Sequence, residues 1–113
     1  MTESPKVEVV ADPERNRFVI RVDGVEAGHS EYVRTGELVI FTHTEIDDAF
    51  EGRGLGSKLA RGALDAVRAA DEPIVPLCPF IASFIAKHPE YDDLVDHECL
   101  AFMESRAKRR SSG

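Results

Sequence analysis

A cluster of glycines separates two different sequence patterns in this chain of 113 residues. Residues 51–67 read EGRGLGSKLARGALDAV, and Gly52, Gly54 and Gly56 fall within five positions. Fixing glycine in a folded chain carries a large cost in conformational entropy, so a cluster of glycines needs a physical reason. Either the glycines only form a turn, or the missing side chains let a backbone come close to another group.

Four segments before the glycines alternate apolar and polar residues, as β-strands do. They are residues 6–12, 17–24, 25–36 and 37–46. Asp23 and Gly24 form a hairpin turn signal between the second and third of these segments. Short turns without a helical pattern between the segments predict an antiparallel sheet. The last segment is the most apolar and β-branched of the four, which predicts an internal strand.

The pattern becomes helical after the glycines. From Leu55 onward apolar residues recur every three or four positions, as on one face of an amphipathic helix. Residues 74–78 predict a short buried strand. Residues 79–88 predict a second helix, with Pro79 at its first position and Cys78 as its N-cap. After residue 88, a short final helix and coil are equally compatible with the sequence.

These patterns predict an α+β fold with a mostly antiparallel, twisted sheet and two main helices. The length of the chain fits a single domain over residues 1–113. Its core is expected to span about residues 7–95.

Charges are distributed unevenly along the chain, which has a formal net charge of -7. Residues 1–103 hold 10 Lys/Arg and 20 Asp/Glu, a net charge of -10, whereas residues 104–113 hold four basic residues and one acidic residue, a net charge of +3. An acidic body argues against nucleic-acid binding and is compatible with a cationic substrate such as an amine. The basic residues at the end are expected to form a flexible, solvated tail: Arg106, Lys108, Arg109 and Arg110.

The remaining composition indicates a protein of a reducing compartment. No apolar run is long enough to span a membrane, and the N-terminus lacks the pattern of a secretory signal. Cys78 and Cys99 do not make a disulfide framework. His29, His97 and Cys99 do not have the spacing of a metal site, so no metal is expected. We therefore expect a cytoplasmic monomer without a membrane partner.

The order of strand, glycine turn and helix is suited to binding an anion. The first N–H groups of a helix have no partner inside the helix and lie at the positive end of its dipole. Such groups can hold a phosphate or pyrophosphate, and Arg53 and Lys58 add positive charge nearby. A P-loop would require Gly-Lys-Ser/Thr, whereas residues 56–58 read Gly-Ser-Lys. A dinucleotide fingerprint would require a different glycine spacing and a βαβ unit. On the glycines alone, a plain turn is an equal alternative.

Three segments together resemble a known family. They are FTHTEI at residues 41–46, EGRGLGSKL at 51–59 and VPLCPFIASFIAKHPEYDDLV at 75–95. These segments are similar to the GNAT superfamily of N-acetyltransferases, and within it to the small single-domain subfamily named YjdJ-like, or NATD1-like in animals. The resemblance covers about Val7 to Val95. The GNAT pyrophosphate loop has the form Q/R-x-x-G-x-G/A, which Gly54 and Gly56 match and Glu51 does not.

This resemblance implies a GNAT-like fold, acetyl-CoA as co-substrate, and transfer of the acetyl group to an amine. In the family, the pyrophosphate lies on the amides of the glycine loop and the pantetheine lies beside the preceding strand. The residues expected to bind the cofactor are therefore Glu45, Ile46, Arg53, Gly54, Gly56, Ser57 and Lys58, with Phe84 and Lys87 at the adenosine end. No segment identifies the acceptor, and a polyamine, a peptide amine and a protein lysine are equally compatible.

Two residues are candidates for catalysis under this resemblance. His43 precedes the loop, and an imidazole changes its charge near neutral pH, which suits a general base. The alternative is a hydrogen-bonded histidine on a sheet face. Cys78 could carry the acetyl group covalently with His43 as its activator, line the thioester pocket, or serve only as a small buried residue. We expect direct transfer to the amine rather than an acyl-cysteine.

Many GNAT enzymes carry a tyrosine in the later helix as the acid, and residues 79–88 contain none. Tyr91 is a weaker substitute. Phe80, Phe84 and Ile85 are expected in the core, and His88 is expected to be structural or to line the cofactor groove.

Two functions of other classes stay open at this point. One is a non-catalytic module that binds or senses acyl-CoA with the same loop. The other is a small interaction protein that uses its acidic face.

Overall fold

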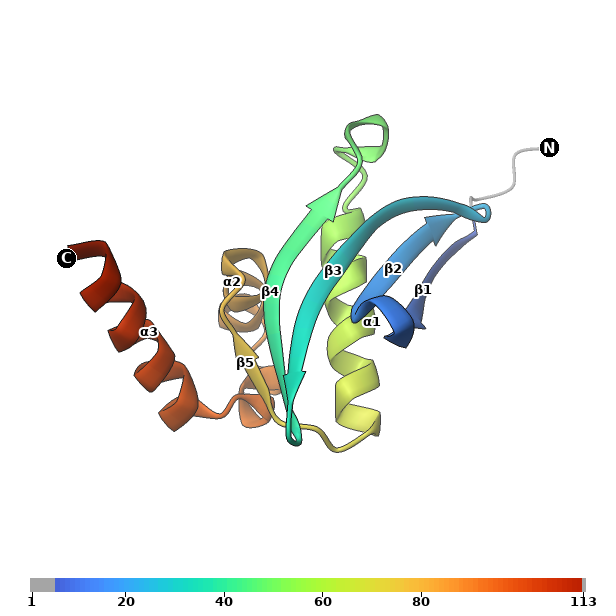
Figure 1. The fold of residues 1–113 in the computed structure, drawn as a ribbon. Coiled ribbons are helices and arrows are strands. Elements are labelled where there is room, and N and C mark those ends of the chain that lie inside the picture. The colour runs from blue at the N-terminus through green and yellow to red at the C-terminus, as the bar shows by residue number, and fades with distance from the viewer. Residues whose placement is uncertain (1–5, 113) are drawn as a thin grey trace.

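The computed structural model describes the backbone of residues 6–112 and the side chains of residues 6–106. Its sheet has five strands that lie side by side in chain order (Figure 1). They are β1 (Val7–Asp12), β2 (Arg17–Val22), β3 (Val25–Thr35), β4 (Leu38–Ile46) and β5 (Ile74–Pro76). The first four pair antiparallel, as their short turns predicted. β4 lies between β3 and β5, which confirms that it is an internal strand.

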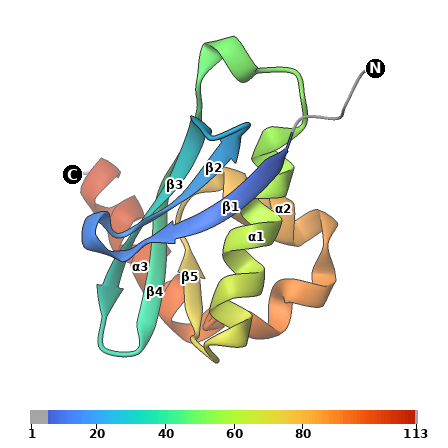
Figure 2. The same ribbon diagram turned by 90° about the vertical axis from the view of Figure 1, so that its right-hand side faces the viewer.

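Two helices lie beside one another on one face of this sheet (Figures 1 and 2). α1 (Leu55–Ala69) packs across β1 to β4, and α2 (Pro79–Lys87) packs over β4 and β5. Their buried side chains join the inner face of the sheet in one core. α1 contributes the predicted apolar stripe, which consists of Leu55, Leu59, Ala60, Ala63, Leu64 and Val67. The predicted α+β fold is therefore confirmed.

β5 is a short strand that pairs parallel with β4. The pairing joins Val39–Phe41 to Ile74–Pro76 and ends there. The backbone N–H of Cys78 still donates to the carbonyl of Phe41 at 2.9 Å. In the part of the chain that the structure describes, β4 then continues to Ile46 without a strand on that side. We term this divergence of β4 from the start of α2 the fork.

The strand is shorter than the predicted 74–78 because α2 begins immediately after it. Cys78 is the N-cap of α2 and Pro79 is its first residue, as predicted. Pro79 has a backbone angle that suits the first turn of a helix. Leu77 and Cys78 therefore lie between the end of β5 and the first residue of α2.

A β-bulge in β4 changes which side chains face the helices. Phe41 and His43 pair with adjacent residues of β3, so Thr42 between them is an extra residue. Strict alternation from the buried Phe41 would place His43 on the inner face. Because of the bulge, Thr44 takes the inner position instead, where its hydroxyl contacts Cys78. His43 consequently lies on the outer face of the sheet.

The chain after residue 88 contains more regular structure than the sequence predicted. η3 (Pro89–Leu94) returns along α1, and α3 (His97–Ser112) is a helix of 16 residues that leads away from the sheet (Figure 1). Asp96 accepts a hydrogen bond from the N–H of Cys99 and so caps the first turn of α3. Among residues 6–112, no helix is long and apolar enough to cross a membrane. The expected flexibility of residues 104–113 stays a prediction.

Gly62 allows α1 to approach β1 closely, and this contact can be tested. A Cβ at Gly62 would lie 2.7 Å from the Cβ of Val9. We expect Gly62→Leu to displace β1 and to lower the free energy of unfolding by about 1–3 kcal/mol, although leucine is the better helix former. Ala66→Leu is the matched control, because Ala66 lies on the exposed side of α1. Urea denaturation that finds the two variants equally stable would contradict the proposed packing.

Candidate active site

The glycine loop and the start of α1 form a hollow on the surface, which we term the loop cradle. Its volume is about 230 Å³, and it is lined by Ile46, Phe50, Glu51, Gly52, Gly54, Leu55, Gly56, Ser57 and Phe80. Gly54 is the N-cap of α1, and no side chain caps this helix. The first N–H groups of α1 therefore open into the cradle at the positive end of the helix dipole.

The three glycines of the loop serve different purposes. Gly52 and Gly54 have φ angles of +82° and +71°, in the left-handed region that favours glycine. Gly56 lies inside α1, and a Cβ there would be 2.6 Å from the Cζ of Phe80. The cluster thus forms a turn at its first two glycines and permits a close approach at the third.

Phe80 is the residue that makes this approach, and its predicted place in the core was wrong. It is 41% exposed and lies on the first turn of α2, with its ring over Gly56. The buried face of α2 is narrower than the sequence pattern indicated. It consists of Ile81, Phe84 and Ile85, and Phe80 lies just outside it.

Two cationic side chains flank the loop cradle. The guanidinium carbon of Arg53 lies 5.4 Å from the ring centre of Phe50, a cation–π contact. Lys58 is exposed on the first turn of α1. Both place positive charge near the uncapped N–H groups, whereas Glu51 brings a negative charge to the lining. The cradle is therefore electrostatically suited to an anion at the helix start.

Three polar side chains form a hydrogen-bonded chain at the fork. The Cys78 thiol donates to Oγ1 of Thr44 at 3.3 Å, and the hydroxyl oxygens of Thr44 and Ser30 lie 3.0 Å apart. Cys78 is 2% exposed, and Ser30 is fully buried. Thr44 precedes Ile46, a residue of the cradle lining, by about 7 Å along β4. The fork and the loop cradle are therefore adjoining parts of one site.

His43 lies on the other face of β4. Its ring centre is 6.4 Å from that of His29, and its Nε2 is 3.8 Å from a carboxylate oxygen of Glu45. More than half of its side chain is exposed. The structure does not bring His43 and Cys78 together, so the alternative in which His43 activates Cys78 as a covalent carrier has no support in this geometry. Glu45 also faces outward, whereas its neighbour Ile46 lines the loop cradle.

Sequence reasoning missed Thr44 and Ser30 as parts of the site. Unbroken alternation along FTHTEI predicts that His43 shares the inner face with Phe41. The bulge at Thr42 reverses this, and no glycine or proline in the segment marks its position. Only the pairing of β4 with β3 reveals it.

The structure does not bring Phe84 and Lys87 to the loop cradle. Phe84 is buried in the core, with its ring centre 4.2 Å from that of His88. This stacking favours the structural role of His88. Lys87 ends α2, about 12 Å along the helix axis from Pro79. Contact of Phe84 and Lys87 with an adenosine group stays a prediction.

Tyr91 connects η3 to α1 through contacts with three residues of that helix. Its hydroxyl donates to Asp65 at 2.6 Å, and the guanidinium groups of Arg61 and Arg68 lie 5.8 and 5.4 Å from its ring centre. Burial, followed by the hydrogen bond to Asp65, raises the pKa of Tyr91 above its ordinary value. Asp65 lies about 13 Å further along α1 than Gly56. Tyr91 is therefore a structural contact that is remote from the loop cradle.

We expect Tyr91→Phe to lower stability without altering the cradle. The variant keeps the aromatic ring, but Asp65 loses its hydrogen-bond donor, at a cost of about 1–2 kcal/mol. Because the folded state raises the pKa of Tyr91, unfolded protein loses this proton at lower pH. The hydroxyl's contribution to the free energy of unfolding is thus complete below the ordinary tyrosine pKa. It is lost as the pH rises through the pKa of Tyr91 in the folded state.

Urea unfolding at a series of pH values measures this effect. The stability difference between wild type and Tyr91→Phe should shrink above about pH 10. A difference that stays constant into strongly alkaline solution would show that Asp65 does not hold the phenol in its protonated form.

The residues considered for a metal site lie on different elements. His29 is on β3, whereas His97 and Cys99 are on the first turn of α3. Among the described residues, His, Cys, Asp and Glu side chains form no group of three or more that could hold a metal ion.

Comparison with known proteins identifies the class of this fold and site. The family model described as GCN5-related N-acetyltransferase matches residues 17–94. The chain therefore belongs to the GCN5-related N-acetyltransferase family. The loop cradle and the fork both lie inside the matched region, and α3 lies outside it.

Within that class, the chain is similar to vertebrate proteins named Protein NATD1. It is 31% identical to the Gallus gallus protein over 85 residues, which cover 74% of this chain and 77% of the relative. It is also 31% identical to the Homo sapiens protein over 85 residues, with coverages of 74% and 75%. The Danio rerio protein is 31% identical over 101 residues, with coverages of 83% and 89%. These similarities confirm the resemblance to the NATD1-like subfamily.

Proposed function

We propose that this protein is an acetyl-CoA-dependent N-acetyltransferase whose acceptor is an amine. The observation that carries the proposal is the uncapped start of α1 in a glycine loop beside the unpaired edge of β4, in a chain of this family. Glycine turns alone are common and would not be sufficient. Here the turn supplies anion-binding N–H groups, and the strand edge beside it supplies further hydrogen-bonding groups.

In this proposal the loop cradle binds the pyrophosphate of CoA. The N–H groups of Gly56 and Ser57 donate to its oxygens in the first turn of α1. Arg53 and Lys58 add positive charge, which strengthens hydrogen bonds to a charged phosphate. Gly54 matters because a side chain at this N-cap would strain the backbone and occupy part of the cradle.

The pantetheine arm of CoA would lie along the unpaired edge of β4. The backbone groups of β4 that face the fork can bond the amides of the arm, much as another strand would. Ile46 and Phe80 line the cradle where it meets this edge. The thioester would then lie at the fork, beside Thr44 and Cys78.

Acetyl transfer requires that the amine lose a proton and that the departing sulfur gain one. The neutral nitrogen attacks the thioester carbonyl carbon, the carbon–sulfur bond breaks, and CoA leaves as the thiol. We assign the amine proton to His43, which lies next to Thr44 in the chain but on the outer face. An acceptor that approaches across the unpaired edge of β4 would meet both residues. The Thr44 hydroxyl, which accepts from the Cys78 thiol, donates a hydrogen bond to the departing sulfur. Solvent at the open edge of β4 supplies the proton that converts the departing thiolate to the thiol.

The geometry favours direct transfer over an acyl-cysteine. A nucleophilic thiol needs an adjoining base. Cys78 is buried, its thiol donates a hydrogen bond to the hydroxyl of Thr44, and it lies on the face opposite His43. We therefore interpret Cys78 as lining of the thioester site.

A non-catalytic acyl-CoA-binding module is the second candidate. It is favoured by one observation, which is that His43 is exposed and lies 3.8 Å from Glu45 rather than in the fork. Such a module would bind CoA but would release no free CoA from acetyl-CoA with any amine. Calorimetric titration with CoA, followed by a thiol-release assay over a panel of amines, separates the two functions. Absence of CoA binding would exclude both functions and leave only the small interaction protein that uses its acidic face.

Replacement of Gly54 tests the cradle. We expect Gly54→Ala to weaken CoA binding at least tenfold, or roughly 1.4 kcal/mol, because it strains the helix start. Gly36→Ala is the matched control, since Gly36 also has a positive φ of +58° but lies in the turn between β3 and β4. Equal CoA affinity of the two folded variants, measured by calorimetry, would mean that the loop is only a turn.

Replacement of His43 and Cys78 tests the chemistry. We expect His43→Ala to lower kcat about a hundredfold to ten-thousandfold, as loss of a general base does. Cys78→Ser should lower it only a few-fold, and Cys99→Ser on α3 is its matched control. Intact-mass analysis after incubation with acetyl-CoA should show no acetyl group on the protein. An acetyl group on Cys78 that passes to an amine at the turnover rate would overturn direct transfer.

A further inference from the structure

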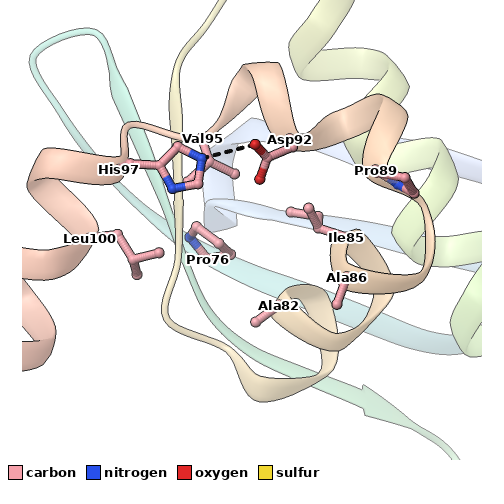
Figure 3. A pocket seen from close by; sticks show the side chains of 9 residues that line it. All are labelled: Pro76, Ala82, Ile85, Ala86, Pro89, Asp92, Val95, His97 and Leu100. Carbon is pink, nitrogen blue, oxygen red and sulfur yellow. Dashed lines mark hydrogen bonds and ion pairs between the residues drawn. The ribbon is translucent and has the colours of Figure 1, made fainter.

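The sheet ends in two edges of different character, and the edge at β5 is protected. There the backbone of Val95 forms a bridge to Ile74, and Pro76 has no N–H group to offer another strand. An apolar groove of about 430 Å³ adjoins this edge, and the polar side chains of its lining, Asp92 and His97, lie 3.1 Å from each other (Figure 3). A further strand is therefore not expected at β5.

The edge at β1 is open in the part of the chain that the structure describes (Figure 2). β1 pairs with β2 without interruption, and the N–H of Asp23 donates to the carbonyl of Lys6 at 2.8 Å. Bonded and non-bonded pairs alternate along antiparallel strands, so the even-numbered residues of β1 bond to β2. Val7, Val9 and Ala11 therefore direct their N–H and carbonyl groups away from the sheet.

A second β1 strand can satisfy all of these outward groups. When two copies of β1 run antiparallel with Val9 opposite Val9, each Val7 lies opposite Ala11 of the other copy. The outward groups then face one another in three successive residue pairs, and each pair can exchange two hydrogen bonds. The arrangement has two-fold symmetry, in which the same surface serves on both partners.

The charges of β1 favour this register. Lys6 and Asp12 each stand three residues from Val9, so each Lys6 lies opposite Asp12 of the other copy. Both side chains alternate onto the same face of the strand. Sliding one strand by two residues in either direction would instead put Glu8 opposite Glu8 or opposite Asp12, and like charges in opposed positions destabilise a sheet. This self-complementarity indicates a second copy of the chain as the partner.

α1 crosses β1 at the same residue. A Cβ on Gly62 would lie 2.7 Å from the Cβ of Val9, so the backbone of α1 passes directly over the centre of this register. Because Gly62 has no side chain, each copy leaves room for α1 of the other above the joined strands. Val7 and Val9 pack only partly against the core, and the pairing would cover more of their apolar surface.

We propose that the chain forms a dimer in which β1 pairs antiparallel with β1 of a second copy, centred on Val9. An open strand edge alone would be weak support, since many sheets have one. Here the outward groups, the charges and the position of Gly62 share one centre. The dimer replaces the monomer that we expected from the sequence. The fork lies at β4, about 14 Å across the sheet from β1, so the dimer leaves it open.

Analytical ultracentrifugation of the full chain over a micromolar concentration series tests the dimer. Ala11→Pro removes an N–H that faces away from β2, so the pairing of β1 with β2 is kept. We expect wild-type dimers, and we expect Ala11→Pro to weaken them roughly tenfold or more, because symmetry removes two hydrogen bonds between the copies. Ala11→Val is the matched control, since it keeps the N–H. A monomer at every concentration, or a dimer that Ala11→Pro leaves unchanged, overturns the proposal.

Hydrogen exchange of the wild-type chain gives a second measurement that needs no variant. The N–H groups of Val7, Val9 and Ala11 should exchange more slowly as the protein concentration rises, because they gain acceptors only in the dimer. Exchange rates at these residues that do not change with concentration, in a sample that dimerises, would place the contact elsewhere.

A charge exchange tests the register. Lys6→Glu and Asp12→Lys should each weaken the dimer, because each brings like charges together between the copies. The double variant should recover most of the wild-type association. Lys87→Glu, at the exposed end of α2, is the control for the change in net charge. A double variant that associates no better than the single variants would show that Lys6 does not meet Asp12. None of these measurements depends on CoA or on acetyl transfer.

Discussion

The parallel pairing of β4 with β5 ends after three residue pairs, and the site depends on that early end. Cys78 donates its N–H to Phe41, and Pro79 then starts α2. A longer β5 would cover the edge of β4 with hydrogen bonds. Instead, α2 leaves the sheet with Phe80 on its first turn, and this ring lies against the first turn of α1. One short strand therefore produces both the fork and a wall of the loop cradle.

The bulge at Thr42 decides which chemistry each face of β4 can offer. It directs Thr44 inward, where it joins Cys78 and Ser30, and it directs His43 outward toward Glu45. The hydroxyls and the thiol of the inner face form hydrogen bonds with one another, whereas the outer face presents an imidazole and a carboxylate to solvent. In the function proposed above, the two faces would serve different halves of an acetyl transfer.

Local patterns in the sequence predicted most of the fold. Periodicity placed the first four strands and α1 because each buries one face, and the glycines located the cradle because Gly52 and Gly54 need positive φ. Periodicity could not reveal the bulge at Thr42, since an extra residue in one strand is defined only by its partner strand. It also placed Phe80 in the core, because Phe80 is apolar and one position from the buried face of α2. The extent of α3 was not predictable from burial, because this helix packs mainly at its root.

What the loop offers a ligand is mainly main chain: N–H groups at a helix start, exposed because glycine stands at the N-cap. Every amino acid except proline carries the same N–H, so such a contact does not depend on the identity of most residues around it. Substitution of the neighbouring side chains therefore need not abolish this main-chain contact, provided that the backbone angle at Gly54 is kept. Contacts on the outer face of β4 are more sensitive to substitution, because His43 and Glu45 present side chains rather than main-chain groups there. Substitutions on this face can consequently change what it binds while the main-chain contacts of the loop stay the same.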